Sequence, residues 1–243
     1  MRRLYYMALP LLLAATFAAG WVAPANSAAA EDATTIGLAL IATDTTDTQA
    51  LRQAAEAGDP SAQYQLAAAY YFGEGVPQDL FEMVRWTRKA AKQGHADAQY
   101  ELGKVYLHGS GVAQDNREAV RWWREAAEQG HAMAQFNLGA SYNIGQGVVQ
   151  DYSEAVRWYR QGAEQGLAEA QFGLGGAYQF GWGVPEDLVY AHKWYNLAGS
   201  QGYTVAQENR RDVERRMTRE QVAEAQRLAR EWMREFEGRT EGQ

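Results

Sequence analysis

The residues best suited to bind a metal in this chain of 243 residues are its four histidines, His95, His108, His131 and His192. His95 and His131 lie 36 residues apart, at equivalent positions of a repeated pattern. Neighbouring helices pack on the order of 10 Å apart, so these two imidazoles are too distant to share one ion. Later copies of the pattern carry Leu167 and Tyr203 at this position. We therefore expect no metal site and no cofactor.

Paired carboxylates are the next candidates, because glycoside hydrolysis uses two acids at a set separation. Aspartates recur every 36 residues, at Asp79, Asp115, Asp151 and Asp187. In the first three copies a glutamate follows three residues later, as Glu82 follows Asp79. This spacing predicts a capping box, in which the aspartate accepts from backbone N–H groups and the glutamate reaches back to the aspartate N–H. We interpret the recurring acids as helix caps rather than as a catalytic pair.

Motifs for a nucleophile or a phosphate loop are also missing from the sequence. No serine lies in a Gly-x-Ser-x-Gly elbow, and Gly109-Ser110-Gly111 is typical of a turn between helices. The glycine pairs are not followed by Lys-Ser or Lys-Thr, as a phosphate loop requires. We predict no catalytic and no cofactor-binding residues, and therefore no enzyme.

A period of 36 residues organises most of the chain. It is shared by tryptophans, tyrosines and leucines at Trp86, Trp122, Trp158 and Trp194, at Tyr70, Tyr106, Tyr142 and Tyr178, and at Leu66, Leu102, Leu138 and Leu174. Glycine pairs followed by valine recur at the same step, starting with Gly73, Gly75 and Val76. So many positions on one period predict a tandem array in which each copy is one supersecondary unit.

Each copy is interpreted as two helices. In the second copy, Ala98, Leu102 and Tyr106 form one apolar stripe at helical spacing, and Gly109 and Gly111 end that helix. A second helix follows Asp115 and buries a face that consists of Ala119, Trp122, Trp123, Ala126 and Ala127. Neither helix can bury its stripe alone, so consecutive units must stack to form a continuous core.

The pattern Ala-x-x-x-Leu-Gly-x-x-Tyr-x-x-Gly-x-Gly-Val-x-x-Asp-x-x-x-Ala-x-x-Trp-x-x-x-Ala-Ala-x-x-Gly resembles the Sel1-like repeat, a relative of the tetratricopeptide repeat. The four copies span residues 61–96, 97–132, 133–168 and 169–204. The first copy departs at Ala67 and Met83, and the fourth at Gly199. The resemblance covers roughly residues 48–236 and implies an all-α fold, a right-handed α-solenoid of helix-turn-helix units.

The array is expected to have capped ends. Residues 48–60 resemble a second helix without its partner, and residues 205–237 predict capping helices with one apolar and one charged face. We expect residues 31–47 to form a loose linker and residues 238–243 a frayed tail.

Residues 1–30 have the layout of a signal peptide. Arg2 and Arg3 precede an apolar stretch, and small residues at 25–30 offer a cleavage site. We expect cleavage and a periplasmic or secreted protein, with no stable membrane insertion afterwards. An uncleaved anchor is the alternative, because the apolar stretch could just span a bilayer. The chain has no cysteine, so packing alone must stabilise the fold.

The charge of the chain excludes one class of partner. Without residues 1–30, Lys and Arg fall from 23 to 21 against 30 acidic residues, which leaves a net charge of −9. Nucleic-acid binders normally present a basic surface, so we expect no nucleic-acid partner.

Resemblance to tetratricopeptide arrays implies that the first helices line a concave groove for a protein or peptide partner. Three positions of these helices are candidates: one is aromatic in every copy, and two vary between copies while the frame stays constant. They are Tyr64, Tyr100, Phe136 and Phe172, then Tyr71, Leu107, Asn143 and Gln179, then Phe72, His108, Ile144 and Phe180. The aromatic position suits core packing as well as binding, and simple drift would also explain the variable ones. Trp182 joins them either as an exposed binding residue or as a side chain packed on the Pro185 turn.

The function that these observations favour is an adaptor or scaffold that binds another protein. Two alternatives remain: a cell-envelope hydrolase acting on peptidoglycan or a β-lactam, and a structural scaffold in envelope polysaccharide export. The resemblance does not identify the partner or the oligomeric state.

Overall fold

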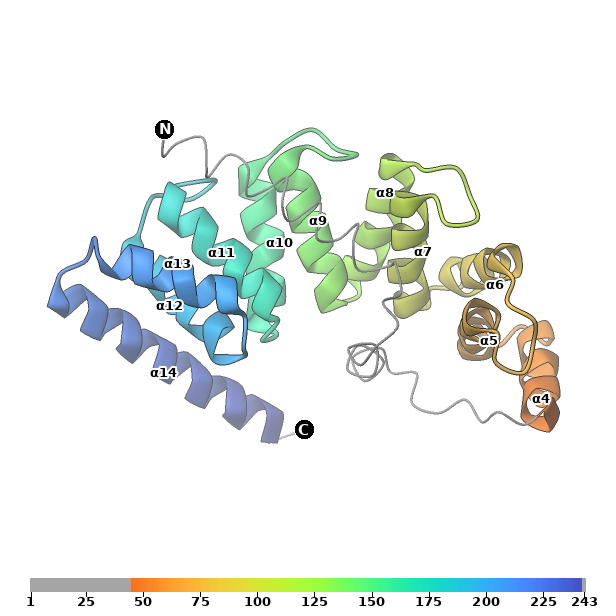
Figure 1. Cartoon of the computed structure of the whole chain (residues 1–243). Helices are drawn as coiled ribbons and strands as arrows, with labels where there is room; N and C mark the ends of the chain where they lie inside the picture. Colours follow the sequence, from red (N-terminus) through yellow and green to blue (C-terminus); the bar gives the residue numbers. More distant parts are fainter. Residues whose placement is uncertain (1–44, 242–243) are drawn as a thin grey trace. The chain divides into compact units, whose positions relative to one another are not determined.

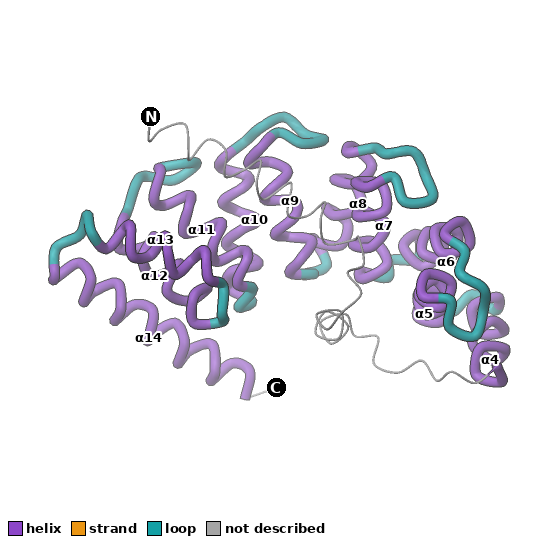
Figure 2. The backbone as a smooth tube through the Cα atoms, viewed as in Figure 1, coloured by secondary structure: helices purple, strands orange, loops and turns teal. Residues whose placement is uncertain are grey.

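A computed structural model describes residues 45–241, and all regular structure in this range is helical (Figures 1 and 2). The expected signal peptide and nearly all of the expected linker lie outside the described residues. The helices are α4 (Thr45–Glu56), α5 (Pro60–Phe72), α6 (Leu80–Lys92), α7 (Ala96–His108), α8 (Asn116–Glu128), α9 (Ala132–Ile144), α10 (Tyr152–Glu164), α11 (Ala168–Phe180), α12 (Leu188–Ser200), α13 (Thr204–Glu214) and α14 (Arg219–Glu241). Within residues 45–241, no helix is both long and apolar enough to cross a membrane.

The helices form two compact units, with the boundary between Gln114 and Asp115. Unit 1 contains α4 to α7, and unit 2 contains α8 to α14. From α4 to α7 and from α8 to α13, each helix packs on the helices next to it in sequence (Figure 1). This arrangement of helix-turn-helix units of about 36 residues is the predicted all-α solenoid.

Residue types at the helix ends explain where the helices start and stop. Asp151 has an extended backbone, and its Oδ1 accepts from Ser153 N at 2.9 Å and Glu154 N at 3.1 Å. Equivalent caps at Asp79, Asp115 and Asp187 start α6, α8 and α12. The first helix of each pair ends at a glycine with left-handed backbone, such as Gly145 with φ of 74°.

The two glycines of each pair have different roles. At Gly145, an added Cβ would lie 3.3 Å from Gln150 Cβ, so the left-handed backbone is what requires glycine. At Gly147, an added Cβ would overlap the carbonyl oxygen of Asn116, at the start of α8. Gly183 faces the carbonyl of Tyr152 in the same way. The second glycine therefore lets the turn approach the backbone of the preceding second helix.

The core follows the predicted stripes. The four repeated leucines are fully buried and the four repeated tryptophans nearly so, which confirms that the tryptophans are core residues. Small residues admit the partner helix as expected: a Cβ on Gly139 would lie 2.8 Å from Tyr159 Cδ1, and one on Gly175 would lie 2.7 Å from Tyr195 Cδ1.

A glutamine that recurs in each repeat links the first helix to the second helix before it. Gln135 Nε2 donates to Ala127 O at 3.1 Å, and Gln135 Oε1 accepts from Gln165 Nε2 at 2.7 Å. The same donation to the carbonyl eight residues earlier is made by Gln63, Gln99, Gln171 and Gln207. Each of these carbonyls also accepts from the N–H of the glycine three residues later, such as Gly130 for Ala127, so the glutamine amide supplies a second donor at the helix C-terminus.

Arginine and tyrosine form a second recurring link. Arg124 Nη2 donates to Tyr142 OH at 2.7 Å, across 18 residues. The same bond joins Arg52 to Tyr70, Arg88 to Tyr106 and Arg160 to Tyr178, each at 3.2 Å. These side chains connect consecutive repeats at their edges.

The C-terminal helices close unit 2. The long helix α14, dark blue in Figure 1, packs along α12. Trp232 meets Trp194 edge to face at 6.0 Å and stacks on Phe236 at 4.9 Å. The helix continues to Glu241, so residues 238–241 are helical where the sequence suggested a frayed tail.

Candidate protein-binding surfaces

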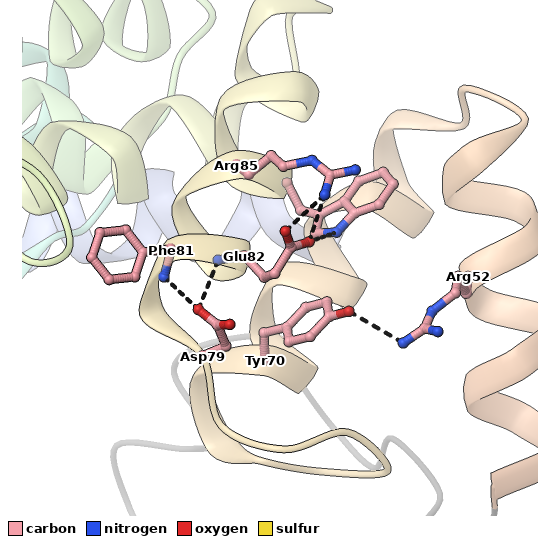
Figure 3. Close-up of polar contacts among 7 residues, drawn as sticks. Arg52, Tyr70, Asp79, Phe81, Glu82 and Arg85 are labelled. Carbon is pink, nitrogen blue, oxygen red and sulfur yellow. Dashed lines mark hydrogen bonds and ion pairs between the residues drawn. The ribbon is translucent and has the colours of Figure 1, made fainter.

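The recurring acids are structural, although not in the predicted way (Figure 3). Asp79 caps α6 as expected, but its N–H donates to Tyr70 O at 2.9 Å and not to Glu82. The Glu82 carboxylate instead accepts from Arg85 at 2.7 and 2.9 Å and from Trp86 Nε1 at 3.0 Å. The predicted return bond of the capping box is therefore wrong here, because the preceding helix already satisfies the aspartate N–H and an arginine faces the glutamate.

Two histidines also cap helices. His95 Nδ1 accepts from Ala98 N at 3.3 Å, and His131 Nδ1 accepts from Ala134 N at 3.2 Å. Leu167 and Tyr203 occupy this position later and make no such bond. Among the described residues, no three His, Cys, Asp or Glu side chains gather closely enough to hold a metal ion.

Three of the candidate binding residues are buried in unit 2. Phe136 and Phe172 are 3% and 6% exposed, and their rings lie 5.9 Å from Tyr159 and 5.6 Å from Tyr195. Gln179 is 6% exposed and accepts from Tyr195 OH at 2.6 Å. These side chains belong to the interior and offer almost no area to a partner.

In unit 1, Tyr71 and Phe72 form an exposed aromatic pair at the end of α5. Their rings meet edge to face at 4.8 Å, and Phe72 is 52% exposed. Tyr64 and Tyr100 are half-buried, and the Tyr64 ring lies 4.9 Å from His95.

At the end of α7, Leu107 and His108 are half-buried. Burial lowers the pKa of His108, and the nearby Lys104 lowers it further. Lys104 Nζ is paired with Glu101 at 2.8 Å. His108 is therefore neutral at pH 7 and can act as an aromatic, hydrogen-bonding surface group.

In unit 2, three rings form what we term the unit 2 aromatic cluster: Tyr152, Phe180 and Trp182. Trp182 stacks on Phe180 at 4.9 Å and on Tyr152 at 5.7 Å. Gln150 Nε2 bonds both Tyr152 OH at 3.0 Å and Asn143 O at 2.8 Å, which fixes the cluster to the end of α9. The Trp182 ring thus stacks on two aromatic rings, whereas the sequence suggested either free exposure or packing on Pro185.

The unit 2 cluster includes a residue that sequence reasoning missed. Tyr152 is 37% exposed, and the equivalent position holds Leu80, Asn116 and Leu188 in the other copies. That variation was the available signal. Asn143 and Ile144 are half-buried at the end of α9, which contacts α11.

Three of the first helices carry few charges. No charged residue lies in α5 or α9, and α11 carries Glu169 alone, whereas α7 carries Asp97, Glu101 and Lys104. The second helices instead carry arginine–glutamate pairs, such as Arg121 with Glu118 and Arg157 with Glu154. The variable ends of α5, α9 and α11 therefore offer aromatic rings and neutral amides.

Tandem helix pairs with a constant frame and variable first-helix ends define the class of helical-repeat scaffolds. A family model described as Sel1 repeat matches residues 60–95, 96–131, 132–167 and 168–203, one residue earlier than the predicted boundaries. The chain belongs to the Sel1 repeat family. Proteins of this family are typically scaffolds for protein–protein interaction.

Solved structures similar to this chain include two that are at least 30% identical to it. A Sel1 repeat protein from Oxalobacter formigenes is 36% identical with a TM-score of 0.62, over 68% of this chain and 66% of that protein. The protein c5321, a protective antigen of uropathogenic Escherichia coli, is 30% identical with a TM-score of 0.49, over 80% of this chain and 57% of that protein. The chain thus spans about two thirds or less of their lengths. Among curated proteins, the search found no match.

Proposed function

We propose that this chain is an adaptor that binds a protein or peptide partner through the unit 2 aromatic cluster and the neighbouring end of α9. The observation that carries the proposal is the stack of Tyr152, Phe180 and Trp182, which the repeat frame does not require. Aromatic side chains held rigid by one another bind with little loss of entropy, and tryptophan and tyrosine are enriched at binding hot spots.

The character of the surface limits the partner. With almost no charge on α9 and α11, the surface suits an apolar segment, helical or extended, whose backbone can bond to neutral amides such as that of Asn143. It does not suit a phosphate backbone, which requires clustered cations.

We further propose that the adaptor acts outside the cytoplasm, in the periplasm or as a secreted protein. The support is the arginine pair, apolar stretch and small-residue sites of residues 1–30. The mass of the N-terminal peptide of the chain, recovered from cell fractions, tests this proposal. A chain whose first residue follows a cleavage between residues 27 and 30 supports export, and a full-length cytoplasmic chain refutes it.

Binding is tested by photo-crosslinking in the native compartment. A benzophenone amino acid replaces Ile144 beside the cluster, and a control chain carries it at the exposed Met233 of α14. We expect a defined protein adduct at Ile144 that is absent at Met233.

Substitutions then show whether the cluster carries the binding. In the Ile144-labelled chain, Trp182→Ala should reduce the adduct about tenfold or more, as loss of a hot spot does. Tyr190→Ala is the matched control, because Tyr190 is also an exposed stacked aromatic but lies on α12. Equal adduct in both variants, with unchanged helicity, would refute the site. Turnover of peptidoglycan or a β-lactam by the purified chain would refute the adaptor function.

A further inference from the structure

The contact between α12 and α13 differs from the earlier contacts of the array. One repeat earlier, the equivalent positions hold Val156, Leu174, Tyr178 and Arg160, whereas here they hold His192, Arg210, Glu214 and Asn196. Valine also fills the His192 position in the first two copies, at Val84 and Val120. An apolar core position has become ionisable at this one contact, which we term the C-terminal joint.

At the C-terminal joint, His192 is buried and the polar atoms around it are incompletely paired. His192 is 1% exposed, and neither ring nitrogen is hydrogen-bonded to a described residue. Its Nε2 lies 3.8 Å from Glu214 Oε2, which is beyond hydrogen-bond reach. Arg210 Nη1 donates to Asn196 Oδ1 at 2.7 Å, but the buried Arg210 Nε has no partner among the described residues.

The surroundings of His192 favour its neutral form. Burial lowers the pKa of His192 from its ordinary 6.5, Arg210 lowers it further, and Glu214 opposes both. Both of these charged groups come from α13. The α14 acids Glu231 and Glu235 act on Lys193, the next residue of α12. A proton on His192 would thus place a cation next to Arg210 in a desolvated site, with one partly exposed carboxylate as counter-charge.

We propose that the C-terminal joint is an acid-sensitive contact, at which protonation of His192 loosens α13 from α12 and opens the end of the helix array. When the joint opens, the imidazole is solvated and recovers its ordinary affinity for protons. The closed joint binds the proton more weakly than the open one, so opening becomes more favourable as pH falls below about 6.5. Above that pH both states are neutral at His192, and the joint is indifferent to pH.

The test uses thiol probes, because the chain has no cysteine of its own. Val213→Cys places a thiol at a fully buried position of α13 in the joint. Ala177→Cys is the matched control, at the equivalent buried position of α11, 36 residues earlier. Each chain is labelled with dithiodipyridine, which reacts with thiols at acid pH, and the ratio of the two rates removes the reagent's own pH dependence.

We expect the rate ratio to rise by up to about tenfold between about pH 7.5 and about pH 5.5, the limit for uptake of one proton. His192→Val, which restores the residue of the other repeats, should flatten the rise. Glu214→Gln should steepen it, because the counter-charge is lost. A ratio that does not change with pH, or a rise that persists in the His192→Val chain, would overturn the proposal.

A second measurement needs no cysteine. Hydrogen exchange of α13 amides, divided by that of α11 amides, is compared between the wild type and His192→Val over the same pH range. If α13 of the wild type loses protection at acid pH and α13 of His192→Val does not, the proposal is supported. If the exchange ratio changes with pH in the same way in both chains, the proposal is contradicted.

Discussion

Replacement of Gly147 by alanine tests how the glycine pair shapes the turn between helices. Gly145 and Gly147 both have φ of 74°, so alanine pays the same backbone penalty at either position, about 1–2 kcal/mol. At Gly147 the new Cβ also overlaps Asn116 O, whereas at Gly145 its nearest neighbour is Gln150 Cβ at 3.3 Å, which is a tight contact but not an overlap. Relief of such an overlap requires a backbone shift, which costs about 1–3 kcal/mol more.

We therefore expect Gly145→Ala to lower the free energy of unfolding by about 1–2 kcal/mol and Gly147→Ala by about 2–5 kcal/mol. Urea titrations of the two variants and the wild type, followed by far-UV circular dichroism and by tryptophan fluorescence, measure both values. If the two variants are equally destabilised, close approach to α8 is not what requires the second glycine. A larger loss at Gly145 would reverse the assigned roles.

Three more predictions concern the frame. Gln135→Leu should lower the free energy of unfolding by about 1–2 kcal/mol, because it removes two hydrogen bonds, while the carbonyl of Ala127 keeps its bond from Gly130 N. In the same urea titration, the control Gln226→Leu, at an exposed position, should stay within about 0.5 kcal/mol of the wild type. Asp151→Ala should cost about 0.5–2 kcal/mol by loss of the α10 cap, and Asp151→Asn, which keeps an acceptor, should retain most of the thermal stability. Burial raises the pKa of Tyr159 far above its ordinary 10.0, so the unfolded chain loses this proton at a lower pH than the folded chain. The free energy of unfolding should therefore fall by about 1.4 kcal/mol per pH unit above 10.0. In alkaline urea titrations, Tyr159→Phe should show a correspondingly shallower fall.

Periodicity predicted the frame because the frame is local. Tryptophans and leucines at a constant step identify the buried stripe of each helix, and aspartates and glycines identify the ends. The capping aspartates and the turn glycines lie where these patterns place them. The caps at both helix ends depend on neighbours within a few residues, which a sequence displays directly.

The binding residues were harder to predict, because one helix position can face either a partner or a neighbouring helix. Phe136 and Phe172 share a position with Tyr64 and Tyr100, yet the former are buried and the latter half-exposed. The rings of Tyr159 and Tyr195, on the next helices, lie 5.9 Å and 5.6 Å from the two phenylalanines. Periodicity identifies a face of a helix but not what covers that face.

The sequence alone also did not predict which polar side chains bond to one another. Glutamate three residues after an aspartate matches a capping box, yet Glu82 pairs with Arg85 because Tyr70 O already accepts from the Asp79 N–H. The choice depends on the carbonyl of a residue nine positions earlier. The Gln135 amide bonds were likewise hidden, although the glutamine recurs at every repeat.

The polar bonds that recur between consecutive repeats bridge 8, 18 or 30 residues, each less than one repeat length. If residues 132–167 were excised, Tyr178 would take the place of Tyr142 opposite Arg124, and Gln171 would take the place of Gln135 opposite Ala127. Each severed bond would be remade with a partner of the same type. Evolution can therefore shorten or extend such a chain by whole repeats, and so change its reach, while these recurring bonds are kept.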